Sequence, residues 1–447
     1  MYKAFPYNRM IRMGQTRLRC GNGKDSMAEV ITVQGGYPIE GTIPIGGAKN
    51  SVLKLMAATS LAAGSYTIGN VPDISDVHIM AEVLRCLGAK VSFSDHTLFI
   101  DTLKLESCET PYELVVKMRA SIAVLGPLVG RFKHARVAMP GGCNIGARNL
   151  DMHITGLEHL GVRFDSDHGF IVAEAPEGLH GAEVSLDFPS VGATENLMMA
   201  AVRAEGTTVI ENAAREPEIA DLADFLNGMG AHVVGAGSPV IEIAGVDELH
   251  ACDHTTCSDR IEAGTYLVAG ALMGGPLTVK HIDPSYLTRA LDVLERMGVD
   301  VSCTADSITV ARERPLKAAD IQTLPHPGFP TDLQAQFMVL CILASGTSVI
   351  TENVFENRFL FASEITRMGA DIRIEGHHAF IKGIDHLSGA PVVSPDLRGG
   401  AALVLAGLAA EGQTVVSDIR HIDRGYEGFV DKLAAVGARV AREDLDR

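Results

Sequence analysis

Six glycines divide most of this chain into units of nearly equal length. They are Gly88, Gly161, Gly230, Gly298, Gly369 and Gly437, so successive glycines are 73, 69, 68, 71 and 68 residues apart. Each one ends an amphipathic helical pattern and precedes an alternating segment that is typical of a strand. Glycine suits such a helix end because it adopts positive φ without strain. The sequence therefore predicts an α/β chain of six repeats of about 70 residues, each with two helices and several strands.

Upstream of each glycine lies a second helical segment, rich in Ala, Leu, Met and Val on every face. These segments begin at Ala48, Arg119, Ser190, Asp259, Thr331 and Asp396. A helix that is apolar all round must be buried, whereas its polar first turn has to reach a surface or a cleft. Free N–H groups and the positive end of the helix dipole attract anions there. Ser, Thr and Asp at these starts also fit simple N-caps.

Length and composition suggest more than one domain. The chain has 447 residues, 47% hydrophobic and 21% charged, which is typical of a soluble globular protein too large for one core. We expect two domains of three repeats each, with a boundary in the polar stretch 250–257. Residues 1–26 are basic and lack the apolar segment of a signal peptide. We interpret them as a disordered extension or as residues before a natural start at Met27, with a transit-like role as the weaker alternative.

The charge and the cysteines narrow the class of protein. There are 38 Lys and Arg against 55 Asp and Glu, a net charge of −17, which disfavours nucleic acid or an anionic membrane as partner. No apolar run reaches the length of a membrane span. The eight cysteines show no disulfide framework, as in a reduced cytoplasm. We therefore expect a cytoplasmic protein that binds anionic ligands through local clusters of Lys and Arg.

Four side chains that can bind metals lie together in the boundary stretch: His250, Cys252, His254 and Cys257. A zinc site is one interpretation of this cluster. Most structural zinc sites, however, add a second ligand pair from a distant segment, which this cluster lacks. We therefore expect no metal in this protein.

Cys143 lies in a glycine-dense loop, residues 140–148, between a strand and a helix. Glycines make such a loop mobile, and a thiol there is exposed to whatever enters a cleft. Arg148 nearby would lower the pKa of the thiol and make it a usable acid or nucleophile. The alternative is a turn cysteine with no role.

Several separate motifs, in order, resemble the enolpyruvyl transferases, and among them the members that act on UDP-N-acetylglucosamine. The motifs are residues 47–50, 119–122, 140–148, 329–337 and 423–426. The resemblance covers the chain from about Met27 to the C-terminus. It implies a pair of inside-out α/β barrel domains, residues 49–256 and residues 27–48 with 257–447, and an active site in the cleft between them.

The resemblance also implies a reaction. The enolpyruvyl group of phosphoenolpyruvate moves to the 3-hydroxyl of UDP-N-acetylglucosamine with release of phosphate, the first committed step of peptidoglycan synthesis. Cys143 matches the cysteine that delivers a proton to the methylene carbon and can form a covalent adduct with phosphoenolpyruvate. Asp332 matches the carboxylate that acts as general base on the sugar hydroxyl. No cofactor is implied.

The same resemblance assigns the binding residues. Those for phosphoenolpyruvate are Lys49, Asn50, Arg148, Arg398 and Arg424. Those for UDP-N-acetylglucosamine are Arg119, Arg148, Leu150, Asp151, Ser190, Val191, Asp332 and Val354. Fixed cations stabilise such an anionic substrate without a metal.

Some residues near these motifs have other expected roles. Asp259, Arg260 and Glu262 begin a core helix, where we expect a structural ion pair, and His153 is expected to pack. Asn149 stands where the family usually has proline, and Phe188 where some members carry a lysine on the nucleotide. Both departures bear on affinity more than on activity.

Three alternatives remain open. The shikimate-pathway enolpyruvyl transferases share the repeats but, by the resemblance, lack an equivalent of the Cys143 loop. RNA terminal-phosphate cyclases have related repeats, which the acidic charge disfavours. A non-catalytic sensor of UDP-sugars would be expected to lose Cys143, Asp332 or Arg424, and all three are present.

Overall fold

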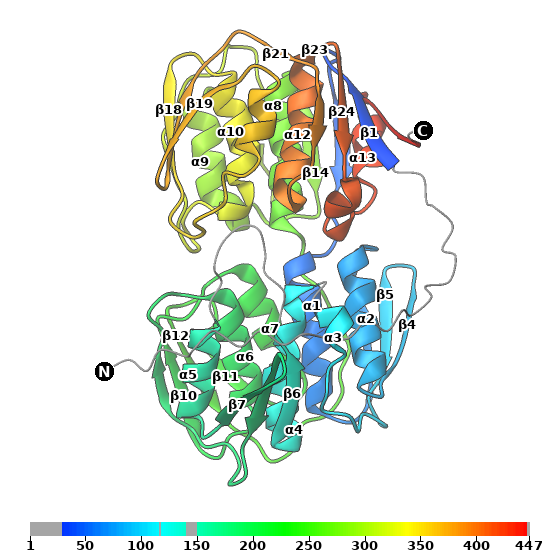
Figure 1. The fold of residues 1–447 in the computed structure, drawn as a ribbon, viewed down its shortest axis with the longest axis vertical. Helices are drawn as coiled ribbons and strands as arrows, with labels where there is room; N and C mark the ends of the chain where they lie inside the picture. The colour runs from blue at the N-terminus through cyan, green and yellow to red at the C-terminus, as the bar shows by residue number, and fades with distance from the viewer. Residues whose placement is uncertain (1–28, 116–117, 140–149, 445–447) are drawn as a thin grey trace, which may run out of the picture.

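The chain forms two hydrophobic cores. The computed structural model describes residues 29–115, 118–139 and 150–444. Within these ranges, one cluster of buried apolar side chains draws on residues 52–243, and a second draws on residues 31–45 and 261–438. Figure 1 shows the corresponding two lobes stacked along the long axis, which we call lobe 1 and lobe 2 in that order. The chain therefore passes from one lobe to the other between residues 45 and 52, and again between residues 243 and 261.

The sheets of both lobes share one pairing pattern. In each four-stranded sheet of the described residues, an edge strand runs parallel to its neighbour, and the next two strands are antiparallel. In lobe 1 the orders are β13 (His254–Thr255), β3 (Ser65–Gly69), β5 (Thr97–Asp101), β4 (Lys90–Ser94), and β9 (Glu183–Ser185), β10 (Thr207–Glu211), β12 (Val240–Ala244), β11 (His232–Val234). A third sheet of lobe 1 has the order β6 (His134–Ala138), β8 (Phe170–Glu174), β7 (Arg163–Asp167).

Lobe 2 repeats this arrangement. Its orders are β2 (Gly41–Pro44), β14 (Leu277–Lys280), β16 (Ser307–Ala311), β15 (Asp300–Cys303); β17 (Ile321–Gln322), β18 (Thr347–Thr351), β20 (His378–Lys382), β19 (Asp371–Glu375); and β22 (Pro391–Val393), β24 (Gln413–Ser417), β1 (Glu29–Gln34), β25 (Arg439–Asp444). A short pair, β21 (Leu387–Ser388) and β23 (Ala410–Glu411), lies apart from them. The fold is thus α/β with mixed sheets, and none of the sheets found in the described ranges closes into a barrel.

The helices form an inner and an outer set. The inner helices are α1 (Lys49–Ala58), α4 (Leu125–Phe132), α6 (Val191–Ala201), α8 (Arg260–Met273), α10 (Gln334–Ile342) and α12 (Leu397–Ala409). The outer helices are α2 (Ser75–Cys86), α5 (Asp151–His159), α7 (Pro217–Gly228), α9 (Thr288–Arg296), α11 (Ala362–Thr366) and α13 (Phe429–Ala435). Short turns complete the set: α3 (Tyr112–Val115), η1 (Thr59–Leu61), η2 (Arg119–Val124), η3 (Pro284–Leu287), η4 (Thr331–Leu333) and η5 (Ile419–Arg424). In the part of the chain that the structure describes, no helix is long and apolar enough to cross a bilayer.

The inner helices confirm the expectation of burial on every face. Residues 260–272 of α8 and residues 398–408 of α12 are all buried. Three of the inner helices have side-chain N-caps: Ser190 caps α6, Asp259 accepts from the N–H groups of Ile261 and Glu262 at the start of α8, and Asp396 caps α12. Two of the predicted helix starts differ, because residues 119–124 and 331–333 are 3₁₀ turns before the α-helix proper, a common way to tighten a helix end.

All six repeat glycines have the predicted conformation. Their φ angles lie between 90° for Gly298 and 108° for Gly88. In every case the next strand begins two residues later, as β4 does at Lys90 after Gly88. A Cβ on Gly88 would approach the Lys104 carbonyl oxygen to 2.5 Å, so both the backbone and the packing require glycine there.

One buried carboxyl should make stability depend on pH. Glu195 of α6 is 1% exposed and lies 2.8 Å from Lys54 Nζ, yet burial raises its pKa to about 7. A folded-state pKa above the ordinary value means that the stability from this group is complete below about pH 4.5 and is lost as the pH rises through 7. Between pH 5 and pH 8 the free energy of unfolding should therefore fall less in Glu195→Gln than in the wild type, and the difference should be up to about 3 kcal/mol.

Urea unfolding at the two pH values measures this difference. Exposed Glu211 on β10 provides the control, because Glu211→Gln should follow the wild type. Equal losses for wild type and Glu195→Gln would contradict the prediction.

Candidate active site

A buried carboxylate bridges two cations where the lobes meet. Lys49 is the first residue of α1 and Asp76 lies in the first turn of α2, both in lobe 1, while Arg424 ends η5 of lobe 2. Lys49 Nζ lies 2.9 Å from Asp76 Oδ2, and Arg424 Nε lies 3.0 Å from Asp76 Oδ1. Asp76 is 1% exposed. The three side chains form one ion cluster that joins the lobes.

Burial and charge act against each other in this cluster. Burial lowers the pKa of Lys49, and the charges of Arg398 and Arg424 lower it further, while Asp76 opposes the shift. Burial alone would raise the pKa of Asp76, but Lys49 and Arg424 together hold it below its ordinary value. Asp76 is therefore ionised at neutral pH, and it is the neighbour that favours the charged form of Lys49.

Asp332 is held by two buried arginines of lobe 2. Arg358 Nη2 donates to its Oδ1 at 2.7 Å, and Arg398 Nη2 donates to its Oδ2 at 3.0 Å. Burial would lower the pKa of Arg398, but Tyr426, Asp332 and Asp259 reverse the shift and raise it. Asp332 itself keeps 24% of its side chain exposed. The carboxylate is thus fixed in orientation while it remains accessible.

The two clusters are neighbours. Gly425 follows Arg424, and a Cβ built on it would lie 3.2 Å from Lys49 Cδ and 2.8 Å from Leu397 Cδ2. Leu397 adjoins Arg398, whose Nε and Nη1 are buried without a hydrogen-bond partner among the described residues. The absence of a side chain at Gly425 lets the Lys49 side chain approach the start of α12. Three cations, from both lobes, therefore share one region.

The nucleotide-sugar candidates lie at helix starts. Leu150 precedes α5 and Asp151 begins it, while Ser190 and Val191 stand at the start of α6. The two starts are adjacent, because a Cβ on Gly192 would lie 3.2 Å from His153 Cε1. Val354 belongs to lobe 2, where its N–H donates to Glu352 Oε1 at 2.9 Å.

The remaining sequence candidates divide into two groups. Asn50 lies beside Lys49 in α1, and its carbonyl oxygen accepts from Lys54 Nζ at 3.2 Å. Arg119 begins η2. Cys143 and Arg148, together with Asn149, lie outside the described residues. The structure thus brings together Lys49, Arg398, Arg424 and Asp332 and has nothing to add on the loop cysteine.

Sequence reasoning missed Asp76 and Arg358 as parts of this region. In the sequence, Asp76 looks like an ordinary acidic residue in the first turn of an amphipathic helix, and Arg358 stands in no motif that was singled out. Their contacts join residues 348 and 26 positions apart. No local signal could have found them.

Residues at the start of α8 form the expected ion pairs near the passage between the lobes. Arg260 Nε lies 3.1 Å from Glu218 Oε1, a buried pair that links α8 of lobe 2 to α7 of lobe 1. Lys432 Nζ lies 2.6 Å from Glu262 Oε1. His153 packs in lobe 1, where its Nδ1 lies 3.0 Å from Asn196 Nδ2.

The possible zinc ligands do not gather around a common point. His254 Nε2 is 2.9 Å from Asp221 Oδ1, and the Cys252 thiol donates to the Phe225 carbonyl oxygen at 3.7 Å. Across residues 29–115, 118–139 and 150–444, no group of three or more His, Cys, Asp or Glu side chains could hold a metal ion.

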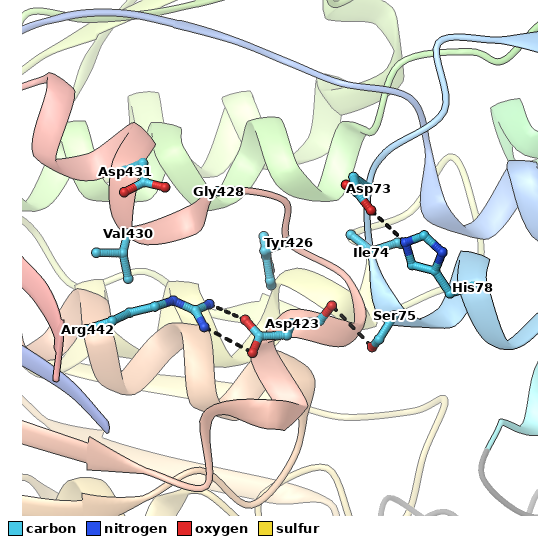
Figure 2. Close-up of a pocket in the computed structure, with 10 residues that line it drawn as sticks. All are labelled: Asp73, Ile74, Ser75, His78, Asp423, Tyr426, Gly428, Val430, Asp431 and Arg442. Carbon is cyan, nitrogen blue, oxygen red and sulfur yellow. Dashed lines mark hydrogen bonds and ion pairs between the residues drawn. The ribbon is translucent and has the colours of Figure 1, made fainter. Parts of the chain in front are cut away.

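A cavity of about 360 Å³ lies close to the ion cluster, again between the lobes. Figure 2 shows Asp73, Ile74, Ser75 and His78 of lobe 1 facing Asp423, Tyr426, Gly428, Val430, Asp431 and Arg442 of lobe 2. Ser75 Oγ donates across the seam to the Asp423 carbonyl oxygen at 3.3 Å, and Arg442 binds the Asp423 carboxylate. Neither Lys49 nor Asp332 lines this cavity, so it is distinct from the candidate active site.

Comparison with known proteins gives consistent matches along nearly the whole chain. The profile of the EPSP synthase (3-phosphoshikimate 1-carboxyvinyltransferase) family matches residues 33–433. The chain is 54% identical over 422 residues to UDP-N-acetylglucosamine 1-carboxyvinyltransferase of Mycobacterium leprae, covering 93% of this chain and 99% of the relative. It is 51% identical over 414 residues to UDP-N-acetylglucosamine 1-carboxyvinyltransferase 3 of Caldanaerobacter subterraneus subsp. tengcongensis, with the same coverage.

Solved structures of similar fold agree. The enolpyruvyl transferase NikO from Streptomyces tendae superimposes with a TM-score of 0.85 at 26% identity, over 94% of this chain and 100% of NikO. EPSP synthase from Acinetobacter baumannii gives a TM-score of 0.72 at 16% identity, over 93% of this chain and 100% of that structure, and indicates the fold alone.

Proposed function

The chain belongs to the EPSP synthase family of enolpyruvyl transferases, and we propose that it acts on UDP-N-acetylglucosamine, the substrate named for its relatives. It transfers the enolpyruvyl group of phosphoenolpyruvate to the sugar 3-hydroxyl and releases phosphate. Relatives named for this activity are 51% and 54% identical over nearly their whole length. The shikimate-pathway reaction and a non-catalytic role are not favoured.

The observation that carries the proposal within the structure is the gathering of cations at the seam. Lys49 of lobe 1 and Arg424 of lobe 2 bind one buried carboxylate, and Arg398 is buried nearby with two nitrogens that have no described partner. Phosphoenolpyruvate carries a phosphate and a carboxylate, and fixed cations stabilise both without a metal or cofactor. We assign Lys49, Arg398 and Arg424 to this substrate, with Asn50 and Arg148 added by resemblance.

Asp332 is the general base in this proposal. Its oxygens accept from Arg358 and Arg398, which fixes the carboxylate, and a carboxylate with its several lone pairs can accept from more than one donor at the same time. A sugar hydroxyl can therefore donate to it and lose its proton as the oxygen attacks the central carbon of phosphoenolpyruvate. Cys143 gives a proton to the methylene carbon in the same step. The methyl carbon of the adduct then loses a proton as the C–O bond to phosphate breaks, which restores the double bond and completes the transfer.

The nucleotide sugar is assigned to residues of both lobes. They are Arg119, Arg148, Leu150, Asp151, Ser190, Val191, Asp332 and Val354. The adjacent starts of α5 and α6 support this assignment, because free N–H groups at helix starts favour anions such as a diphosphate.

We further propose the finer architecture of six repeats in two inside-out barrel domains, residues 49–256 and residues 27–48 with 257–447. The common pairing pattern of the sheets and the two separate cores support it.

We also propose that the protein is cytoplasmic, serves peptidoglycan synthesis, is inhibited by fosfomycin, and binds neither nucleic acid nor membrane.

One assay tests the proposed function. Purified protein should release inorganic phosphate from phosphoenolpyruvate when UDP-N-acetylglucosamine is present, and should not do so when either substrate is omitted. Shikimate 3-phosphate should not replace the nucleotide sugar. Binding of UDP-N-acetylglucosamine without phosphate release would instead favour the sensor alternative.

A further inference from the structure

Asp76 is a buried carboxylate, and burying its charge has a cost in folding free energy. A carboxylate that is 1% exposed is unfavourable unless it is paired and hydrogen-bonded. Asp76 meets this condition through Lys49, 27 positions earlier, and Arg424, 348 positions later. A single buried carboxylate therefore sets the separation of two cations that come from different lobes.

The geometry fixes both cations closely. Arg424 uses two nitrogens on Asp76, with Nε 3.0 Å from Oδ1 and Nη2 3.4 Å from Oδ2, while Lys49 Nζ lies 2.9 Å from Oδ2. A lysine ammonium is otherwise a mobile point charge on a flexible stem. Holding it before the substrate arrives reduces the entropy that binding must overcome.

We propose that Asp76 is a positioning residue for phosphoenolpyruvate, holding Lys49 and Arg424 at a fixed spacing across the seam between the lobes. The proposal rests on the proposed function, because that function gives these cations their substrate. Asp76 acts through the two cations and is not itself assigned a contact with the substrate.

Asp76 also has an electrostatic effect that can be measured. Three charged side chains act on the Lys49 ammonium: Asp76 of α2, Arg424 of η5 and Arg398 of α12. Asp259 at the start of α8 accepts from its backbone N–H at 3.2 Å.

The α7 helix also packs against α1, and its Asp221 is bound to Ser51 of α1 and to His254. Among the groups that shift the pKa of the Lys49 ammonium, Asp76 raises it, whereas burial and both arginines lower it.

The sign of the expected change follows. Asp76→Asn removes a negative charge next to an ammonium whose pKa is already depressed, so Lys49 should lose its proton at lower pH. An opposite charge at this distance is worth about 1 to 3 pH units. The alkaline limb of the pH profile of kcat/KM for phosphoenolpyruvate should therefore move down by at least about 1 unit.

Two measurements on the full chain test this. The first is the pH profile of kcat/KM for wild type, Asp76→Asn and the control Asp73→Asn, since Asp73 is exposed and pairs with His78. The second uses no substrate: acetic anhydride in trace amounts labels unprotonated lysines, and mass spectrometry of the Lys49 peptide at several pH values gives its titration. In Asp76→Asn both should shift to lower pH, and in Asp73→Asn neither should.

The outcomes separate the two proposals. The role of Asp76 would be overturned if the wild type is active and the folded Asp76→Asn variant shows no shift, either in the pH profile of kcat/KM or in the labelling of Lys49. A wild type that releases no phosphate would overturn the proposed function, whatever the labelling shows.

If Asp76→Asn does not fold, Asp76→Glu decides. It keeps the charge but lengthens the side chain, so the alkaline limb should be retained while the KM for phosphoenolpyruvate rises about tenfold, which is roughly 1.4 kcal/mol. The KM for the nucleotide sugar should not change. A wild-type KM for phosphoenolpyruvate would contradict a fixed spacing.

Discussion

Asn in place of Asp332 is expected to lower kcat by roughly 100-fold to 10,000-fold, the usual contribution of a general base. The substitution keeps the size of the side chain but removes the group that accepts the sugar proton. Binding of UDP-N-acetylglucosamine should be largely kept, because the other residues assigned to it remain. Steady-state kinetics give kcat, and calorimetric titration gives the affinity.

Asp306 provides a matched control in the same lobe. It is an exposed surface aspartate whose carboxylate accepts from Thr304 Oγ1, so Asp306→Asn should keep full turnover. Near-normal kcat in Asp332→Asn would remove Asp332 from the mechanism. A loss of nucleotide-sugar affinity without a loss of kcat would make it a binding residue instead.

Replacing Cys143 with Ala should abolish most turnover, by roughly 100-fold or more, whereas Asp should retain much of it. The reason is that a carboxylic acid can donate a proton to the methylene carbon and an alanine cannot. Phosphate release by the two variants distinguishes a proton donor from an obligatory nucleophile. An active Cys143→Ala variant would show that the thiol has neither role.

Fosfomycin adds a chemical test of the same residue. A thiolate attacks an epoxide carbon, a C–S bond forms as the C–O bond breaks, and the resulting alkoxide takes up a proton. The phosphonate should be held by the cations assigned to phosphoenolpyruvate, so the wild type should be inactivated and Cys143→Asp should resist. Mass spectrometry should place the adduct on Cys143.

Three of the described cysteines are poor competitors for the adduct. Burial raises the pKa of Cys252 to about 11 and that of Cys341 to about 12, and it raises the pKa of Cys257 as well. Little thiolate is therefore present on them at neutral pH. Exposed Cys303 supplies the control, since Cys303→Ala should remain sensitive to fosfomycin. An adduct on any cysteine other than Cys143 would overturn the assignment.

Much of the secondary structure could be predicted from the sequence because its causes are local. A helix stops where a residue takes positive φ, and the six repeat glycines do so, each two residues before a strand. The buried helices were also predictable, because a segment that is apolar on every face has no side to present to water. The motifs that contain Lys49, Asp332 and Arg424 indicated the family, since each lies within a short, ordered run of residues.

The partners of those residues were decided by tertiary structure alone. Asp76 meets Arg424 across 348 positions, and Asp332 meets Arg398 across 66. Strands next to or within the two passages between the lobes each supply an edge to a distant sheet, as β2 does to β14 and β13 to β3. Local backbone preference acts over a few residues, whereas an ion pair or a strand pairing depends on which elements packing brings within a few ångströms. The sequence by itself therefore determined the helix ends, the buried helices and the family, and the packing of the two lobes decided which charges share the seam.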